Sequence, residues 1–77
     1  MKRFERPLPI SYDEDADAAY IRFSPGDVFN VDSTYSCDPV EVNGMINLDF
    51  DSDGRLVGIE VLDARSKLPE AILRPAQ

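Results

Sequence analysis

Residues 48–61, with the sequence LDFDSDGRLVGIEV, fit two structures that exclude each other, and the choice between them largely decides the fold. The first is a calcium-binding EF-hand loop, which needs acids at its first, third and fifth positions, then glycine, and a distal glutamate. Those positions hold Asp49, Asp51, Asp53, Gly54 and Glu60. The second is a β-hairpin, in which an Asp-Gly pair forms the tight turn between two strands.

The residues that flank the loop favour the hairpin. An EF-hand requires a helix on each side of its loop, whereas here apolar and polar side chains alternate with a period of two on both sides. A two-residue turn at Asp53–Gly54 would pair Phe50 with Val57. It would also pair Leu48 with Ile59, so that apolar side chains meet across the strands.

A degenerate copy of this stretch occurs earlier in the chain, at residues 10–23. Both copies contain an apolar residue, an aromatic residue, two acids and then an alternating apolar strand. The same geometry would pair Tyr12 with Ala19 and Ile10 with Ile21. The copy lacks the glycine and the distal glutamate, as expected if both stretches share the hairpin and not a calcium loop.

Asn43–Gly44 is a strong turn signal and predicts another hairpin. A two-residue loop would put the apolar side chains of the following strand on the same face as an acid. A loop one residue longer would set Val42 opposite Ile46 and Val40 opposite Leu48. Because a slip of one residue moves every side chain to the other face, the longer loop is the better prediction.

The chain has 77 residues, which allow one small domain. We expect an N-terminal arm at residues 1–9 and a single domain at residues 10–77. A domain of this size buries only about 60% of the surface that its unfolded chain exposes. Disulfides cannot supplement this core, because Cys37 is the only cysteine. We therefore expect a homodimer, for which a free sheet edge is one interface to consider.

The sequence also bears on location. Basic residues near the N-terminus are not followed by an apolar run, so they do not resemble a signal peptide. No stretch approaches the ~20 apolar residues of a membrane span. A lone thiol is typical of a reducing compartment. We therefore expect a cytoplasmic protein without membrane contact.

The net charge is −7 and is unevenly distributed. The segment from Pro7 to Asp63 holds thirteen acids and two basic residues, Arg22 and Arg55, so its charge is −11. Such a body repels nucleic acid, which is bound by Lys and Arg. It would attract a basic protein, although acidic residues also keep a small protein soluble.

Few residues indicate chemistry. The chain has no histidine, so a serine or cysteine nucleophile lacks its usual base. We expect no catalytic site and no cofactor. A weak divalent-cation site on Asp49, Asp51, Asp53 and Glu60 is the alternative, because the hairpin register puts Glu60 on the face that carries Asp49 and Asp51. A solvated acidic face is the simpler interpretation.

Two segments carry a family resemblance: YDEDADAAYIRF at residues 12–23 and LDFDSDGRLVGIEVLDA at residues 48–64. They resemble the DUF2283 family, also called YuzE-like, a group of small bacterial proteins of unassigned function. The resemblance extends over about residues 10–73, and residues 32–43 depart from it. It implies a β-meander with a C-terminal helix and no accepted catalytic residues. Some members resemble the acidic partner of a small toxin, which implies an antitoxin-like role.

We therefore predict an α+β fold, a small antiparallel β-meander of four to five strands with a short C-terminal helix. Residues 56–62 are the most apolar segment and should form a central strand. The helix should begin near Asp63 or Ser66 and cover one face of the sheet. The expected apolar set is Ile10, Tyr12, Ile21, Phe23, Val42, Ile46, Leu48, Phe50, Val57, Ile59, Val61, Leu68 and Ile72.

Overall fold

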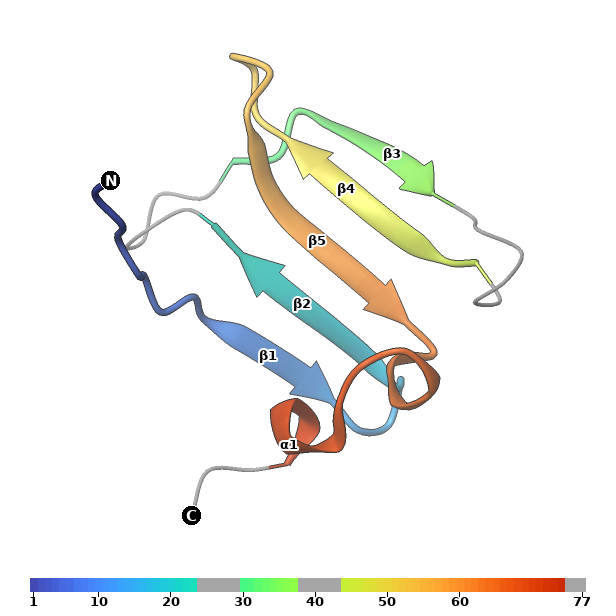
Figure 1. The fold of residues 1–77 in the computed structure, drawn as a ribbon. Coiled ribbons are helices and arrows are strands. Elements are labelled where there is room, and N and C mark those ends of the chain that lie inside the picture. The colour runs from blue at the N-terminus through green and yellow to red at the C-terminus, as the bar shows by residue number, and fades with distance from the viewer. Residues whose placement is uncertain (24–29, 38–43, 75–77) are drawn as a thin grey trace.

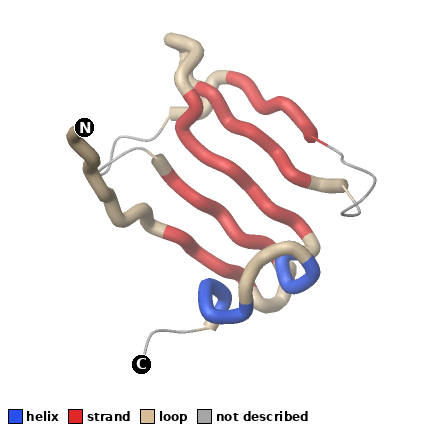
Figure 2. Tube along the Cα trace, viewed as in Figure 1, coloured by secondary structure: helices blue, strands red, loops and turns tan. Residues whose placement is uncertain are grey.

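The computed structural model describes residues 1–23, 30–37 and 44–74 (Figure 1). Five strands form one sheet, and two short helical segments follow the last strand (Figure 2). The strands are β1 (Ile10–Asp13), β2 (Ala18–Arg22), β3 (Ser33–Cys37), β4 (Ile46–Phe50) and β5 (Leu56–Leu62). A 3₁₀ helix at Ala64–Ser66 and helix α1 at Glu70–Leu73 complete the described chain.

The strand order is β1-β2-β5-β4-β3, and all neighbours are antiparallel. The predicted antiparallel sheet and its central strand β5 are therefore confirmed. The meander is only partly right, because the chain passes from β2 to the far edge of the sheet and then returns through β4 to β5. The most apolar strand thus lies between two neighbours, and β3, which consists largely of Ser, Thr and Tyr, lies at an edge.

Residues 48–61 lie in the β4–β5 hairpin, as the strand alternation indicated. The pairing of Leu48 with Ile59 is confirmed. The pairing of Phe50 with Val57 is wrong: Phe50 pairs with Leu56, and the register shifts between Asp49 and Phe50. The reason is the length of the β4–β5 loop.

The β4–β5 loop is longer than a two-residue turn. The amide of Asp51 donates to the carbonyl of Arg55 over 2.9 Å, which leaves three residues in the loop. Gly54 has a φ of 78°, the left-handed conformation that ends the common three-residue hairpin loop. The extra loop residue is absorbed by a bulge in the ladder.

The earlier copy also forms a hairpin, β1–β2. Its predicted pairs, Tyr12 with Ala19 and Ile10 with Ile21, are both present. The Asp13 carboxylate accepts the amides of Asp15 (3.0 Å) and Ala16 (3.2 Å), which fixes the first half of the turn.

The strand pairs predicted around the Asn43–Gly44 turn are wrong, although β3 and β4 are antiparallel neighbours. Ile46 pairs with Cys37 and Leu48 pairs with Tyr35, so the expected partners of β4 are replaced by those of β3. The predicted partners, Val40 and Val42, lie outside the described residues. The Asn-Gly pair is a local signal for a turn. The register of β3 and β4 depends instead on which pairing puts the apolar side chains of both strands on the same face of the sheet.

The buried apolar residues of the described chain are small: Ala19, Val57, Val61 and Ala64. Val57 and Val61 belong to the predicted apolar set. Ile10 and Ile72, which also belong to it, are each 42% exposed, because Ile10 lies on an edge strand and Ile72 on a one-turn helix. Figure 1 shows the reason for so small a core, since the sheet is a single layer with the helical segments at one end.

The C-terminal segment is shorter than predicted. Leu68 and Leu73 pack against the cluster of Ala19, Val61 and Ala64. The α-helix starts after Pro69 and not near Asp63 or Ser66, whose neighbourhood forms the 3₁₀ helix. Neither helical segment in the described chain has the length or apolar character needed to cross a membrane.

Candidate functional site

Strand alternation gives the sheet two different faces. One face is apolar. The other, the polar face, carries a row of residues that face one another across all five strands: Ser11, Tyr20, Glu60, Asn47 and Ser36. The neighbouring row on the same face includes Asp49 opposite Thr34.

The Asp49 carboxylate is held from both sides. The Tyr20 hydroxyl donates to Oδ2 over 2.7 Å, and the Thr34 hydroxyl donates to Oδ1 over 2.7 Å. These short O–H···O⁻ bonds are in the range of charge-assisted hydrogen bonds. Tyr20 reaches Asp49 by crossing strand β5 above Gly58, where an added Cβ would overlap the phenol ring.

Glu60 is held in a similar way. The Asn47 side-chain amide donates to Glu60 Oε1 over 2.9 Å, and the Ser36 hydroxyl donates to Asn47 Oδ1 over 3.0 Å. We call the six residues of these two groups the polar network: Tyr20, Thr34, Ser36, Asn47, Asp49 and Glu60. It links four strands, β2, β3, β4 and β5, and holds two carboxylates on one face.

The network keeps Tyr20 protonated. Burial of the phenol raises the pKa of Tyr20 above its ordinary value of 10.0, and the hydrogen bond to Asp49 raises that pKa further. The hydroxyl is therefore a stable donor to the carboxylate at neutral pH, and the arrangement orients charge without transferring a proton.

The four carboxylates predicted as a weak cation site are not brought together. Asp49 and Glu60 share the polar face, as predicted. Asp51 instead lies in the loop, where it accepts the amides of Asp53 (2.9 Å) and Arg55 (3.0 Å). The Asp53 carboxylate pairs with the Arg55 guanidinium at 3.9 Å on the open surface. Within the described residues, no group of three or more Asp, Glu, Cys or His side chains could hold a metal ion.

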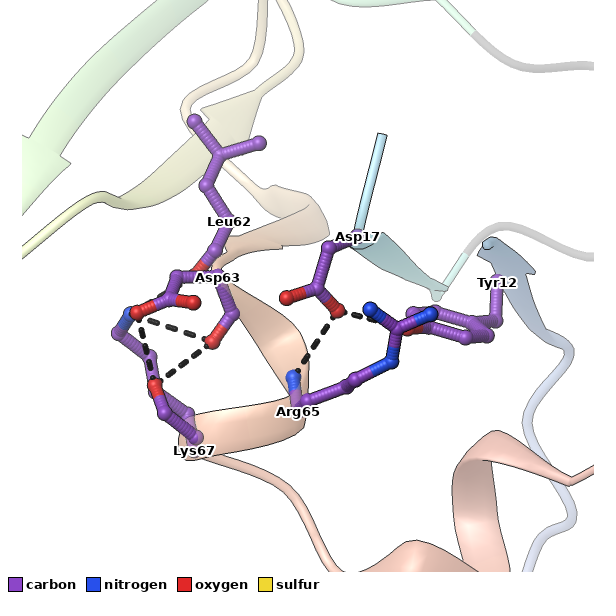
Figure 3. A network of polar contacts seen from close by, with 7 residues as sticks. Tyr12, Asp17, Leu62, Asp63, Arg65 and Lys67 are labelled. Carbon is purple, nitrogen blue, oxygen red and sulfur yellow. Dashed lines mark hydrogen bonds and ion pairs between the residues drawn. The ribbon is translucent and has the colours of Figure 1, made fainter. Parts of the chain in front are cut away.

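A second polar cluster joins the β1–β2 turn to the C-terminal segment (Figure 3). Asp17 Oδ1 accepts the Tyr12 hydroxyl at 2.6 Å and the Arg65 amide at 3.1 Å, and the Arg65 guanidinium lies 6.0 Å from the centre of the Tyr12 ring. The hydrogen bond to Asp17 raises the pKa of Tyr12. Asp17 has a φ of 50°, a conformation that Asp tolerates better than most residues.

Lys67 lies where the 3₁₀ helix meets the end of strand β5, as Figure 3 also shows. Its ammonium donates to the carbonyl of Leu62 over 2.8 Å, while its side chain is only 5% exposed. The Asp63 carboxylate lies 3.8 Å from the same nitrogen. These contacts fix the 3₁₀ helix against the end of β5, so we assign the cluster a structural role.

A surface groove of about 480 Å³ lies between the β1–β2 hairpin and the C-terminal segment. Its lining includes acids and bases: Tyr12, Glu14, Arg65, Glu70, Leu73 and Arg74. Because the lining combines both signs of charge, it selects neither an anion nor a cation.

The sequence indicated Asp49 and Glu60 but not their partners. An aromatic residue such as Tyr20 is expected in the core or at a dimer interface, but the structure places it in the polar network. A usable signal was Gly58, which interrupts the most apolar strand. A glycine inside a strand often marks a close approach of another group, and here that group is the Tyr20 ring.

Comparison with known proteins gives one match. The family described as "Protein of unknown function (DUF2283)" matches residues 10–65. This range covers all five strands and ends within the 3₁₀ helix. Neither the curated proteins nor the solved structures gave a match.

Proposed function

The chain belongs to the DUF2283 family, whose proteins have no known function, and we propose that it is a non-enzymatic module that binds a basic protein. An antitoxin-like role, in which binding neutralises that partner, is the specific form of the proposal. The observation that supports it is the polar network, in which two carboxylates are held in defined positions on a sheet face.

The network suits recognition because its donors are uncharged. Asp49 is oriented by two hydroxyl groups and Glu60 by an amide. Such donors fix the direction of a carboxylate and leave its charge in place. A surface whose side chains are already ordered loses less conformational entropy on binding. Lys and Arg side chains of a partner would complete the remaining lone pairs.

The rest of the acidic charge would assist the encounter. The β1–β2 turn carries Asp13, Glu14, Asp15 and Asp17, and the β4–β5 loop carries Asp51 and Asp53. These two turns lie at opposite ends of the sheet (Figure 1). Arg55 and Arg65 lie at these ends and Arg22 lies on the polar face, but acids outnumber them, and the net negative charge would steer a basic protein and repel nucleic acid.

The test begins with the partner itself. The tagged chain is purified from its own cells at physiological salt, and a stoichiometric basic protein is identified and produced separately. Calorimetry then compares the wild type with Asp49→Asn/Glu60→Gln. The matched control is Glu14→Gln/Asp15→Asn, which removes the same charge from the β1–β2 turn. We expect the first pair to weaken binding at least ~10-fold more than the control.

Two results would overturn the proposal. One is the absence of any stoichiometric basic partner. The other is an equal effect of the two double variants, which would mean that affinity follows net charge alone. The antitoxin-like role has its own readout: the partner expressed alone should arrest growth, and co-expression of this chain should restore it.

A further inference from the structure

We propose that the apolar face of the sheet is the interface of a homodimer, in which a second copy of this chain covers the same face. This interface lies on the side opposite the polar network. The proposal therefore stands or fails independently of the binding function described above.

A continuous apolar row crosses this face. The register pairs Ile10 with Ile21, Ile21 with Ile59, Ile59 with Leu48, and Leu48 with Tyr35. We call these five residues the apolar row. It has one member on each strand, so it runs from one edge of the sheet to the other. Beside Tyr35, the Phe50 ring lies edge-on with the ring centres 5.6 Å apart.

The described residues cover this row only in part, and its three central members, Ile21, Leu48 and Ile59, are half-buried. The C-terminal segment packs on the adjacent row, against Ala19 and Val61, and Ile59 of the apolar row packs against the same cluster. At the two edges Ile10 is 42% exposed and Tyr35 is 61% exposed. No member of the row is fully buried. Stable domains are built from at least two packed layers. We therefore expect a second layer to pack on the apolar face of this sheet.

The exposed area agrees with a missing layer. The accessible surface of the chain is 6134 Å². A compact monomer of 8.6 kDa is expected to expose about 4,700 Å², so the excess is roughly 1,400 Å². The arm at residues 1–9 is exposed throughout and contributes part of it. The whole excess, from which the share of this arm must be subtracted, is larger than the ~800 Å² per partner that a standard interface buries.

The absence of charge on the apolar face indicates that its partner is a second copy of this chain. The described strand residues on the apolar face carry no charge, and the strand acids lie on the polar face or at strand ends. A basic partner would find no complementary group on the apolar face and would lose solvation there. A second copy presents the same neutral surface, and a two-fold axis brings the two rows together. The two acidic polar faces then point outward, where salt and water screen their repulsion.

The experiment is sedimentation and light scattering of the full chain over a range of concentrations. The wild type should show twice the 8.6 kDa of the monomer. Ile10→Asp and Tyr35→Asp place a charge at each end of the row on residues that are exposed in the monomer. Ser11→Asp is the matched control, because it adds the same charge on the same strand as Ile10→Asp but on the polar face, outside the polar network.

Each row variant should raise the dimer dissociation constant at least ~30-fold, since a charge buried in an apolar interface is left unpaired. The Ser11→Asp control should leave it within about threefold. A wild type that stays monomeric would overturn the proposal. So would a dimer that survives Ile10→Asp, because β1 is far from an interface formed by the β3 edge alone.

A second measurement does not depend on variants. In a dimer assembled from labelled and unlabelled chains, isotope-filtered NMR should show contacts between methyl groups of Leu48 and Ile59 and side chains of the other copy. A dimer without such contacts would place the interface elsewhere and refute the proposal.

Discussion

Gly58→Ala is the substitution that tests the polar network most directly. An alanine Cβ at this position would overlap the Tyr20 hydroxyl, Cζ and Cε2. These atoms are the far end of a side chain, so the ring would swing away and the strand would not be forced apart. The cost of the substitution is therefore the loss of the bonds that hold the ring, chiefly the one to Asp49.

The magnitude follows from two opposing effects. A hydrogen bond to a charged group stabilises a fold by about 1.5–3 kcal/mol. Replacing a strand glycine by alanine returns about 0.5–1 kcal/mol, because the unfolded chain loses freedom. The net destabilisation should be about 1–2 kcal/mol, which lowers the melting temperature of a domain of this size by roughly 5–15 °C.

The assay is urea unfolding at one protein concentration in two backgrounds, wild type and Tyr20→Ser. Without the ring, Gly58→Ala should be neutral or slightly stabilising. Gly54→Ala is the control glycine: nothing lies within 4 Å of its added Cβ, but its φ is 78°. It should cost about 1 kcal/mol or more in both backgrounds. If Gly58→Ala costs the same with and without the Tyr20 ring, the close approach is not what selects glycine.

Because the pKa of Tyr20 is raised in the folded state, its contribution to stability is complete below pH 10 and is lost as the pH rises further; Tyr20→Phe should flatten the alkaline part of the stability curve, and an unchanged curve would contradict this. Lys67→Met removes the donor to the Leu62 carbonyl and should lower the free energy of unfolding by about 1–2 kcal/mol, whereas an unchanged melting temperature would exclude the anchoring role. Calorimetric titration with millimolar calcium should give no saturable heat, since Asp51 accepts backbone amides of its own loop and Asp53 pairs with Arg55; saturable binding that is lost in Asp51→Asn would contradict this prediction.

The local part of the fold was predictable from the sequence. Alternation and turn residues are properties of neighbouring positions, so the β1–β2 register and the pairing of Leu48 with Ile59 could be derived. The bulge at Phe50 could not, because an Asp-Gly pair suits a two-residue turn and also a three-residue loop that ends in a left-handed glycine. The crossing from β2 to β3 was also missed. It depends on which strand pairs with the edge of β4 that β5 leaves free, and no local pattern specifies that choice.

The candidate site shows the same division. The calcium-like spacing of acids was visible, and so was the reason to reject it. The hydroxyl groups that orient Asp49 come from positions 29 and 15 residues away in the chain, so only the register of β2, β3 and β4 brings them together. Alternation likewise predicts which side chains share a face, but it does not identify what covers that face. The alternation around Ile10 would be the same whether its side chain packed under a helix or lay exposed on an edge strand. The homodimer proposed above would cover the neutral apolar face with a second copy of the chain, and it would leave the polar face exposed for the proposed basic partner.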